Sequence, residues 1–239
     1  MPNAFARLSG NRFLNAMPAD VAARLADRAE STPMTRGAVL SEAGASTSEI
    51  YFPDRGLISL VKAMSDGRST QVGYAGIEGL TGVSSLLGVA HSAFEAIVQI
   101  EGHATRLKTA DIRAEMRLSP HLTDLVSRYM YFKMNQLAQT AACNRLHTLR
   151  QHCCRWLLIS HENAGADQFT LTHEFLALMM GVNRPSLSLA IASLQRAGLI
   201  RYRRASITIV DRDGLEDGAC ECYRTLRGEL DQVYGGHRR

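Results

Sequence analysis

The side chains best suited to chemistry lie in residues 183–203, and they suit contacts with nucleic acid. The guanidinium of Arg184 can donate two hydrogen bonds to the edge of a guanine. The hydroxyls of Ser186 and Ser188 can reach phosphates or bases, and Leu189 can pack on a thymine methyl. We therefore expect a surface that reads double-stranded DNA, with Arg201 and Arg203 on its phosphates.

The elements that must position these residues are predicted from residues 171–212. Thr172 and Asn183 are expected to cap two helices, and Gly181 between them supplies a sharp turn. Pro185 is tolerated in a first turn, where its missing amide has no intrahelical partner. The buried stripe of the second helix is expected to be Leu187, Ala190, Ile191 and Leu194.

A basic β-hairpin follows these two helices, so the pattern predicts a winged helix-turn-helix. We expect Thr172, Asn183 and Pro185 to belong to its DNA-binding residues as well. The alternative is a helical hairpin in a protein core, because any glycine between two amphipathic helices can produce one.

Positive charge is concentrated in the second half of the chain. The 239 residues carry 27 Lys and Arg against 23 Asp and Glu, a net charge of +4. Residues 1–118 hold twelve of each sign, so the excess lies after position 118. Between Arg184 and Arg212 there are six arginines and one acid, Asp211. Such a localised basic patch is typical of phosphate binding, although any one arginine can belong to a solvated face.

Residues 37–107 are predicted to form short antiparallel strands separated by turns. Turns are expected at Gly44, at 53–56, at Asp66-Gly67 and at 101–102, and Asp-Gly is a strong hairpin signal. The expected strands cover residues 38–40, 50–52, 57–61, 71–74, 96–100 and 104–107. This spacing indicates an antiparallel roll, with a helix over residues 19–30 packed in front of it.

A long helix is expected from Pro120 to about Thr140, with Ser119 as its cap. Its apolar side chains recur at heptad-like spacing and are Leu122, Leu125, Tyr129 and Phe132. Since a roll alone needs no helix of this length, we expect the seam to pair with the same helix of a second copy. The alternative is a helix packed wholly on its own roll.

The five cysteines are interpreted as reduced, buried thiols. They are Cys143, Cys153, Cys154, Cys220 and Cys222, an odd number without a secretory signal. Cys220 and Cys222 are closer than the usual zinc-knuckle pair, and His147 and His152 are five apart, which suits one metal-binding face poorly. A cluster is geometrically conceivable because all five lie in the C-terminal half, but we expect no metal.

The sequence contains no pattern for catalysis or for a membrane span. A Walker loop, a nucleophile elbow and an HExxH motif are all missing, so no catalytic residue is expected. No apolar run approaches the roughly 18–20 residues of a span, and the N-terminus lacks a signal-peptide core. We therefore expect a cytoplasmic protein that is not an enzyme.

The order of roll, long helix and winged helix-turn-helix resembles the Crp/Fnr family of bacterial transcription regulators. The most specific stretch is THEFLALMMGVNRPSLSLAIASLQRAGLI, and GAVLSEAGASTSEIYFPDRGLISLV and EGLTGVSSLLG are similar to the family's sensor half. The ACECY run resembles a subgroup with no assigned effector. The resemblance implies an α+β fold: a cyclic-nucleotide-binding-like antiparallel β-roll (1–118), a dimerisation helix (119–144) and a C-terminal winged helix-turn-helix (145–239).

The resemblance also implies residue roles, some of them altered. Arg184 falls where the family keeps a base-reading arginine. The next position, commonly Glu, is Pro185, and Leu189 stands where many members carry a second arginine. Because each good bidentate pair contributes about 1–3 kcal/mol of discrimination, we do not expect the family's familiar target sites.

In cyclic-nucleotide-binding members, a Gly-Glu pair holds the ribose and an Arg-Ser or Arg-Thr pair holds the cyclic phosphate. The similar positions imply Glu78 and Gly79, then His91 and Ser92, as ligand-binding residues. His91 takes the place of the arginine and lacks its planar fork of donors. Binding of a cyclic nucleotide in the usual manner is therefore not expected, and no cofactor is firmly implied.

The predicted function is a sequence-specific, DNA-binding transcription regulator that acts as a homodimer on a palindromic operator and contacts RNA polymerase. A signal at the β-roll is expected to modulate its affinity for DNA. The alternative is a ligand- or thiol-sensing protein whose helix-turn-helix mainly makes protein contacts.

Overall fold

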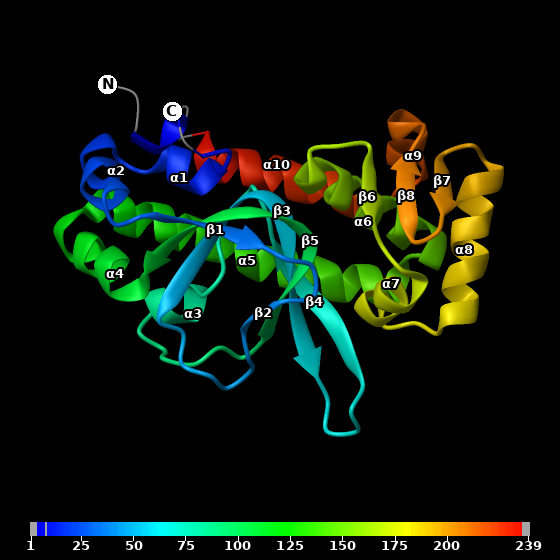
Figure 1. Ribbon diagram of the computed structural model, residues 1–239, viewed down its shortest axis with the longest axis horizontal. Helices are drawn as coiled ribbons and strands as arrows, with labels where there is room; N and C mark the ends of the chain where they lie inside the picture. Colours follow the sequence, from blue (N-terminus) through cyan, green and yellow to red (C-terminus); the bar gives the residue numbers. More distant parts are fainter. Residues whose placement is uncertain (1–3, 8, 236–239) are drawn as a thin grey trace.

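The computed structural model describes residues 4–7 and 9–235 as a β-roll and a helix-turn-helix half arranged along one long helix, α5 (Figure 1). The helices are η1 (Ala4–Arg7), α1 (Arg12–Ala16), α2 (Ala19–Ala26), α3 (Val83–Leu86), α4 (Thr109–Leu118), α5 (Pro120–Leu146), α6 (Leu149–Ala164), α7 (His173–Met180), α8 (Arg184–Arg196), α9 (Arg212–Gly218) and α10 (Cys222–Tyr234). The strands are β1 (Glu30–Met34), β2 (Val39–Ser41), β3 (Glu49–Ala63), β4 (Ser69–Ala75), β5 (Glu95–Lys108), β6 (Gln168–Thr170), β7 (Ile200–Arg203) and β8 (Ser206–Ile209).

The roll is an antiparallel sheet with the strand order β1-β5-β3-β4, and β2 also pairs with β5. The expected hairpin at Asp66-Gly67 is confirmed, and Gly67 has a φ of +84° there. The expected helix over 19–30 is shorter than predicted, because α2 ends at Ala26 and the chain enters β1 at Glu30.

The expected turns at 53–56 and 101–102 are wrong, because β3 and β5 run through them as continuous paired strands. The register shifts between Pro53 and Arg55 and again before Leu57, so these residues form bulges. Gly102 allows the strands to approach closely, since a Cβ there would lie 2.0 Å from the Arg55 carbonyl oxygen. The glycines and the proline do interrupt the regular structure. They produce irregular strand pairing, however, and the chain does not reverse there.

Helix α5 begins as predicted, with Ser119 Oγ accepting a hydrogen bond from the Leu122 amide at 3.2 Å. The predicted intermolecular seam is wrong. Its four side chains are at most 2% exposed and pack in the core that the roll forms with α1, α2 and α10: Leu122, Leu125, Tyr129 and Phe132. The alternative, packing of these residues on their own roll, is therefore what the structure shows.

The C-terminal half places α6 to α9 around a small sheet of order β6-β8-β7. Helix α6 begins with a capping box between Thr148 and Gln151. Among the described residues, no single helix is long and apolar enough to cross a membrane. Helices α7 and α8 pass that test only when taken together, and they are bent by 107° at the turn between them.

The two halves are joined by direct contacts between the roll and α6. Arg55 Nε donates to the Ala164 carbonyl oxygen at 2.7 Å, and the Ile77 amide donates to Asn163 Oδ1 at 2.8 Å. The indole Nε1 of Trp156 donates to Gln71 Oε1 in β4 at 3.2 Å. The helix-turn-helix half is thus held directly against the sheet.

Candidate nucleic-acid interface and sensor cavities

The helix-turn-helix is set by two local caps and one turn. The side chain of Thr172 accepts from the Phe175 amide at 3.2 Å, and that of Asn183 accepts from the Ser186 amide at 2.9 Å. Gly181 has a φ of +63° at the end of α7. The predicted caps and turn are confirmed, and both cap side chains are used to order the helix beginnings.

Helix α8 lies at one end of the molecule with its N-terminal half facing solvent (Figure 1). Arg184 and Pro185 are exposed, Leu189 is 72% exposed, and Ser186 is half-buried. Arg184 Nη2 lies 3.0 Å from Glu174 Oε1, and both side chains are well exposed. Because an exposed ion pair contributes only about 0–1 kcal/mol, Arg184 can leave Glu174 for another acceptor at little cost.

Ser188 does not point freely outward as predicted, because its Oγ lies 3.0 Å from His173 Nδ1. The His173 ring stacks on Tyr202 with centroids 4.3 Å apart and planes at 21°. Burial, and then the charge of Arg184, lower the pKa of His173, so its ring is neutral at pH 7. His173 and Tyr202 were missed by sequence reasoning, because no local spacing rule joins positions on three different elements.

The wing carries the remaining predicted arginines. Arg201 and Arg203 on β7 are exposed, while Ile207 and Ile209 on β8 are buried in the core below. The tight turn between the strands holds Arg204 at a φ of 48° and Ala205 at 62°. Neither is a glycine, so the turn is strained while it presents a third arginine beside the other two.

The roll contains a cavity of about 280 Å³. Ser92 lines it, and so do the acids Glu42 and Glu49. None of the described lining residues is Lys or Arg. A cyclic nucleotide is an anion that needs donors at its phosphate, and the described lining offers hydroxyl groups but no side-chain cation for it.

The other three residues predicted to bind a ligand lie elsewhere. His91 is exposed and forms an isolated bridge with Ser46. A Cβ on Gly79 would lie 2.1 Å from the Tyr129 hydroxyl oxygen, and that hydroxyl donates to the Leu80 carbonyl oxygen at 3.1 Å. The structure therefore brings neither Glu78 nor Gly79 to the roll cavity, and instead packs the segment against α5.

Glu78 is buried, and its Oε2 accepts from the Gly76 amide at 2.9 Å. Burial raises the pKa of this carboxyl, while the nearby charge of Lys133 opposes the shift. The Lys133 ammonium donates to the Tyr74 carbonyl oxygen and to Gln136 Oε1, the latter at 2.6 Å. Burial also lowers the pKa of Lys133 to about 8. Lys133, through its bond to Tyr74 and its charge near Glu78, joins the sheet to the middle of α5.

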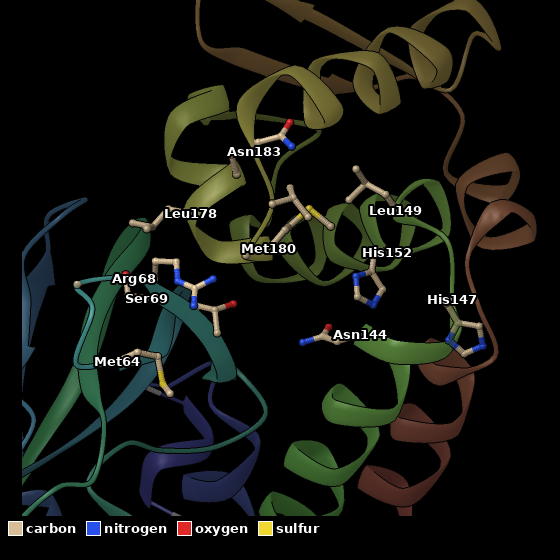
Figure 2. A pocket seen from close by; sticks show the side chains of 15 residues that line it. Met64, Arg68, Ser69, Asn144, His147, Leu149, His152, Leu178, Met180 and Asn183 are labelled. Carbon is tan, nitrogen blue, oxygen red and sulfur yellow. The ribbon is translucent and has the colours of Figure 1, made fainter.

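A groove of about 890 Å³ separates the β3–β4 hairpin from the helix-turn-helix (Figure 2). Met64 and Arg68 of the hairpin lie on one side, and His147 and His152 lie toward the joint between α5 and α6. Beside the groove, Thr70 Oγ1 donates to the Met179 carbonyl oxygen at 3.3 Å. The hairpin thus touches the helix that precedes the turn.

The cysteines are all buried and free, as predicted, but three of them lie together. Cys143 comes from the last turns of α5, while Cys220 and Cys222 come from the corner between α9 and α10. With His147 they form a group whose possible ligand atoms all lie within 4.8 Å of one another. Cys220 and Cys222 were not expected to bind a metal because they are closer in sequence than the usual zinc-knuckle pair, and the structure adds Cys143 and His147 from another helix.

Comparison with known proteins agrees with this geometry. Residues 151–217 match the family model described as the Crp-like helix-turn-helix domain. The chain carries a Crp-like helix-turn-helix domain. It also has the α+β fold of solved Crp/Fnr structures, so the resemblance drawn from its sequence is confirmed. A search of curated proteins found no match.

Three similar structures illustrate the fold. FixK2 from Bradyrhizobium japonicum has a TM-score of 0.68 at 14% identity, over 80% of this chain and 98% of that one. A CRP-family transcriptional regulator from Thermus thermophilus has a TM-score of 0.64 at 24% identity, over 79% and 96%. The c-di-GMP responsive global regulator CLP from Xanthomonas campestris has a TM-score of 0.62 at 15% identity, over 80% and 99%. At these identities the likeness concerns the fold alone.

Proposed function

We propose that this protein is a sequence-specific DNA-binding regulator of transcription that acts as a homodimer and has no catalytic role. The observation that carries the proposal is the solvent-facing start of α8 beside a basic wing, within a Crp-like helix-turn-helix domain. The N-terminal residues of such a helix contact base edges in the major groove, and flanking arginines contact phosphates.

We assign the residue roles according to exposure. Arg184 pairs with a guanine, Leu189 packs on a thymine methyl, and Pro185 and Ser186 contact the groove wall. Arg201 and Arg203 neutralise phosphates. Thr172, Asn183 and Ser188 act mainly by ordering the surface, because their side chains already bond Phe175, Ser186 and His173.

The dimer is proposed to form through a face of α5 different from the one expected from sequence. An exposed strip repeats every three or four residues along this helix and consists of Ser127, Tyr131, Met134, Ala138, Ala141 and Arg145. Tyr131 is 66% exposed and Met134 is 65% exposed. Pairing the strip with its copy buries both side chains in the manner of a coiled coil.

We further propose that residues 1–118 act as a sensor, 119–144 as the dimer helix and 145–239 as the DNA-binding part, with RNA polymerase as a partner on the promoter. The acidic roll cavity supports a signal other than a cyclic nucleotide. A ligand in this cavity would contact Ser92, Glu42 and Glu49, which line it, whereas Glu78, Gly79 and His91 lie outside its lining.

The DNA-binding proposal is tested by selecting bound sites from random duplexes and then measuring affinities of variants across a salt series. Arg184→Ala should lose about 1–3 kcal/mol of discrimination at one base pair of each half-site. Arg203→Ala should weaken all duplexes alike and reduce the salt slope by about 1. Arg36→Ala, an exposed arginine of the roll, is the matched control. Equal affinity of wild type and Arg184→Ala for every duplex would contradict the base-reading role.

The dimer proposal is tested by placing like charges on the exposed strip. Met134→Glu brings two carboxylates together across the proposed seam, so light scattering should report a monomer and affinity for a two-half-site duplex should fall at least tenfold. His121→Glu, exposed on the same helix but outside the strip, should remain dimeric. A wild type that is monomeric at micromolar concentration, or an unchanged Met134→Glu dimer, speaks against this interface.

A further inference from the structure

The group formed by Cys143, His147, Cys220 and Cys222 has the geometry of a binding site for one metal ion. The sulfurs of Cys143 and Cys220 lie 3.5 Å apart, and Cys222 Sγ lies 3.5 Å from His147 Nδ1. A tetrahedral zinc ion with Zn–S bonds of about 2.3 Å and Zn–N bonds of about 2.0 Å keeps its ligand atoms roughly 3.5–3.8 Å from one another. Both separations are close to the edges of such a tetrahedron.

Two remote segments supply the four ligands. Cys143 and His147 are one helical turn apart at the end of α5, where His147 is the C-terminal cap. Cys220 and Cys222 flank Glu221 at the start of α10, and Cys220 lies 77 positions after Cys143. Thiols that merely fill a core have no reason to gather a histidine nitrogen, so the set is more specific than burial alone explains.

The neighbours of the group fit a metal as well. Glu221 Oε1 lies 3.2 Å from His147 Nε2 and so directs the other ring nitrogen, Nδ1, toward the sulfurs. Carboxylates orient metal-binding histidines in this way. Gln139 Nε2 donates to Cys222 Sγ at 2.9 Å, a bond that stabilises a thiolate.

The charges around the group also suit a divalent metal ion. Three thiolates and one divalent ion leave a net charge of −1. Arg155 is buried at 9% exposure, its Nη1 has no hydrogen-bond partner among the described residues, and its positive charge acts on Cys143 and Cys220. Its guanidinium is therefore placed to offset that negative charge.

We propose that Cys143, His147, Cys220 and Cys222 bind one Zn²⁺ in a tetrahedral Cys₃His site that fastens the α9–α10 corner to the end of α5. All possible ligand atoms lie within 4.8 Å of one another, which suits a single ion. An iron–sulfur cluster places its thiolates on several irons and needs a wider cage. Binding releases the three thiol protons, so affinity falls as the pH falls.

The first test measures metal in the full-length protein purified under reducing conditions without chelators. Mass spectrometry should find about one zinc per chain, and the metal-stripped protein should give thiolate-to-metal absorption and tetrahedral bands with Co²⁺. Cys220→Ser, Cys222→Ser and His147→Ala should each retain less than a tenth of the zinc. Cys153→Ala, a buried cysteine that contacts Met180 instead, should retain all of it. Glu221→Gln should weaken Zn²⁺ binding 10- to 100-fold without changing the stoichiometry.

A second measurement uses the wild type alone, in case a variant does not fold. Added Zn²⁺ should protect Cys143, Cys220 and Cys222 from alkylation and leave Cys153 and Cys154 unchanged. A folded wild type that takes up neither Zn²⁺ nor Co²⁺ would overturn the proposal. So would a Cys143–Cys220 disulfide in its place, or equal zinc in wild type and all ligand variants. None of these outcomes depends on whether the protein binds DNA.

Discussion

Gly79 shows how one position can resemble a ligand site and serve packing instead. Its missing side chain leaves room for the Tyr129 ring, whose hydroxyl bonds the backbone of Leu80 in both directions. Any larger residue here displaces Tyr129 from the core around α5. A glycine and a glutamate in sequence can therefore mark a contact between the sheet and the long helix as readily as a sugar-binding loop.

The lowered pKa of Lys133 predicts how the free energy of unfolding changes at alkaline pH. Its pKa is about 8 in the folded protein and 10.5 when unperturbed, so above pH 8 the unfolded chain binds more protons. Stability due to this residue therefore rises between pH 8 and 10.5, by on the order of 3 kcal/mol at 1.36 kcal/mol per pKa unit. Urea unfolding at pH 7.5, 9 and 10.5 should show the free energy of unfolding of the wild type rising relative to that of Lys133→Met, because other buried groups such as Tyr129 and Cys153, whose pKa values burial raises, are common to both proteins.

Lys62→Met is the control for this measurement, because the Lys62 side chain is exposed. The comparison uses only the change with pH, since Lys133→Met also removes hydrogen bonds. Parallel profiles for wild type and Lys133→Met would contradict the shifted titration.

Single residues were predictable where the interaction is local. Thr172 and Asn183 each bond an amide three residues ahead, so residue type and spacing suffice to identify them. The bond between Ser188 and His173 spans fifteen positions and depends on how two helices cross. The sequence alone gave no sign of this partner, and Ser188 was therefore predicted to contact DNA.

At the level of elements, the wing turn is unusual in holding two non-glycine residues at positive φ. Turns of this kind favour Asn and Gly, and each strained residue costs about 1–3 kcal/mol. Ala205 has a φ of 62° and is a different residue from the arginines proposed to contact phosphates. The strain is therefore removable without touching Arg201 or Arg203.

Ala205→Gly should stabilise the protein by about 1 kcal/mol and raise the melting temperature by roughly 2–4 °C, measured by circular dichroism. Ala197→Gly is the matched control, because Ala197 is exposed and has ordinary helical angles (φ −76°, ψ −2°). It should lower stability by about 0.5–1 kcal/mol, since glycine there only adds unfolded-state freedom. A lower melting temperature for Ala205→Gly would show that the turn is relaxed as it stands.

Helices and strands were predicted well where the hydrophobic pattern comes from a single buried face. They were predicted less well where an element also has a second face with its own role, as in α5. The seam of α5 has a true heptad-like spacing, but that spacing is the same whether a helix is covered by its own chain or by a copy. Leu122 and Tyr129 are covered by their own roll. The exposed strip with Tyr131 and Met134 is less apolar and was overlooked for that reason.

Across the whole molecule, α10 returns from the winged half to complete the N-terminal core. Leu226, Leu230 and Val233 pack in the same cluster as Phe13 and Phe52. Arg12 also pairs with Asp231 at 2.8 Å and lies over the Tyr234 ring at 5.1 Å. The last helix thus serves the sensor half, although the chain places it after the wing.

Leu230→Ala should therefore destabilise the roll by about 2–5 kcal/mol, the usual cost of truncating a buried leucine. Hydrogen exchange should show faster exchange in β3 and β5, more than a hundred residues away in sequence. Gln232→Ala, exposed on the same helix, should exchange like wild type. If the loss of protection stays within α9 and α10, the helix does not support the roll.

This long return also explains what sequence analysis missed on the largest scale. The roll, the helix-turn-helix and their order follow from patterns within short segments. The cysteine and histidine group forms only because Cys220, 77 positions after Cys143, folds back to the end of α5. No sequence periodicity indicates that these two distant segments lie together. Cys220 and Cys222 were therefore interpreted as isolated thiols.

The position of α10 has a consequence for the order in which the protein is made. A ribosome releases the roll first, yet Phe13, Phe52 and Tyr129 stay partly uncovered until residues 222–234 have been synthesised. Contacts between segments far apart in the sequence form slowly and leave apolar surface open to aggregation in the meantime. We therefore expect the core of the sensor half to be completed only after α10 has been synthesised.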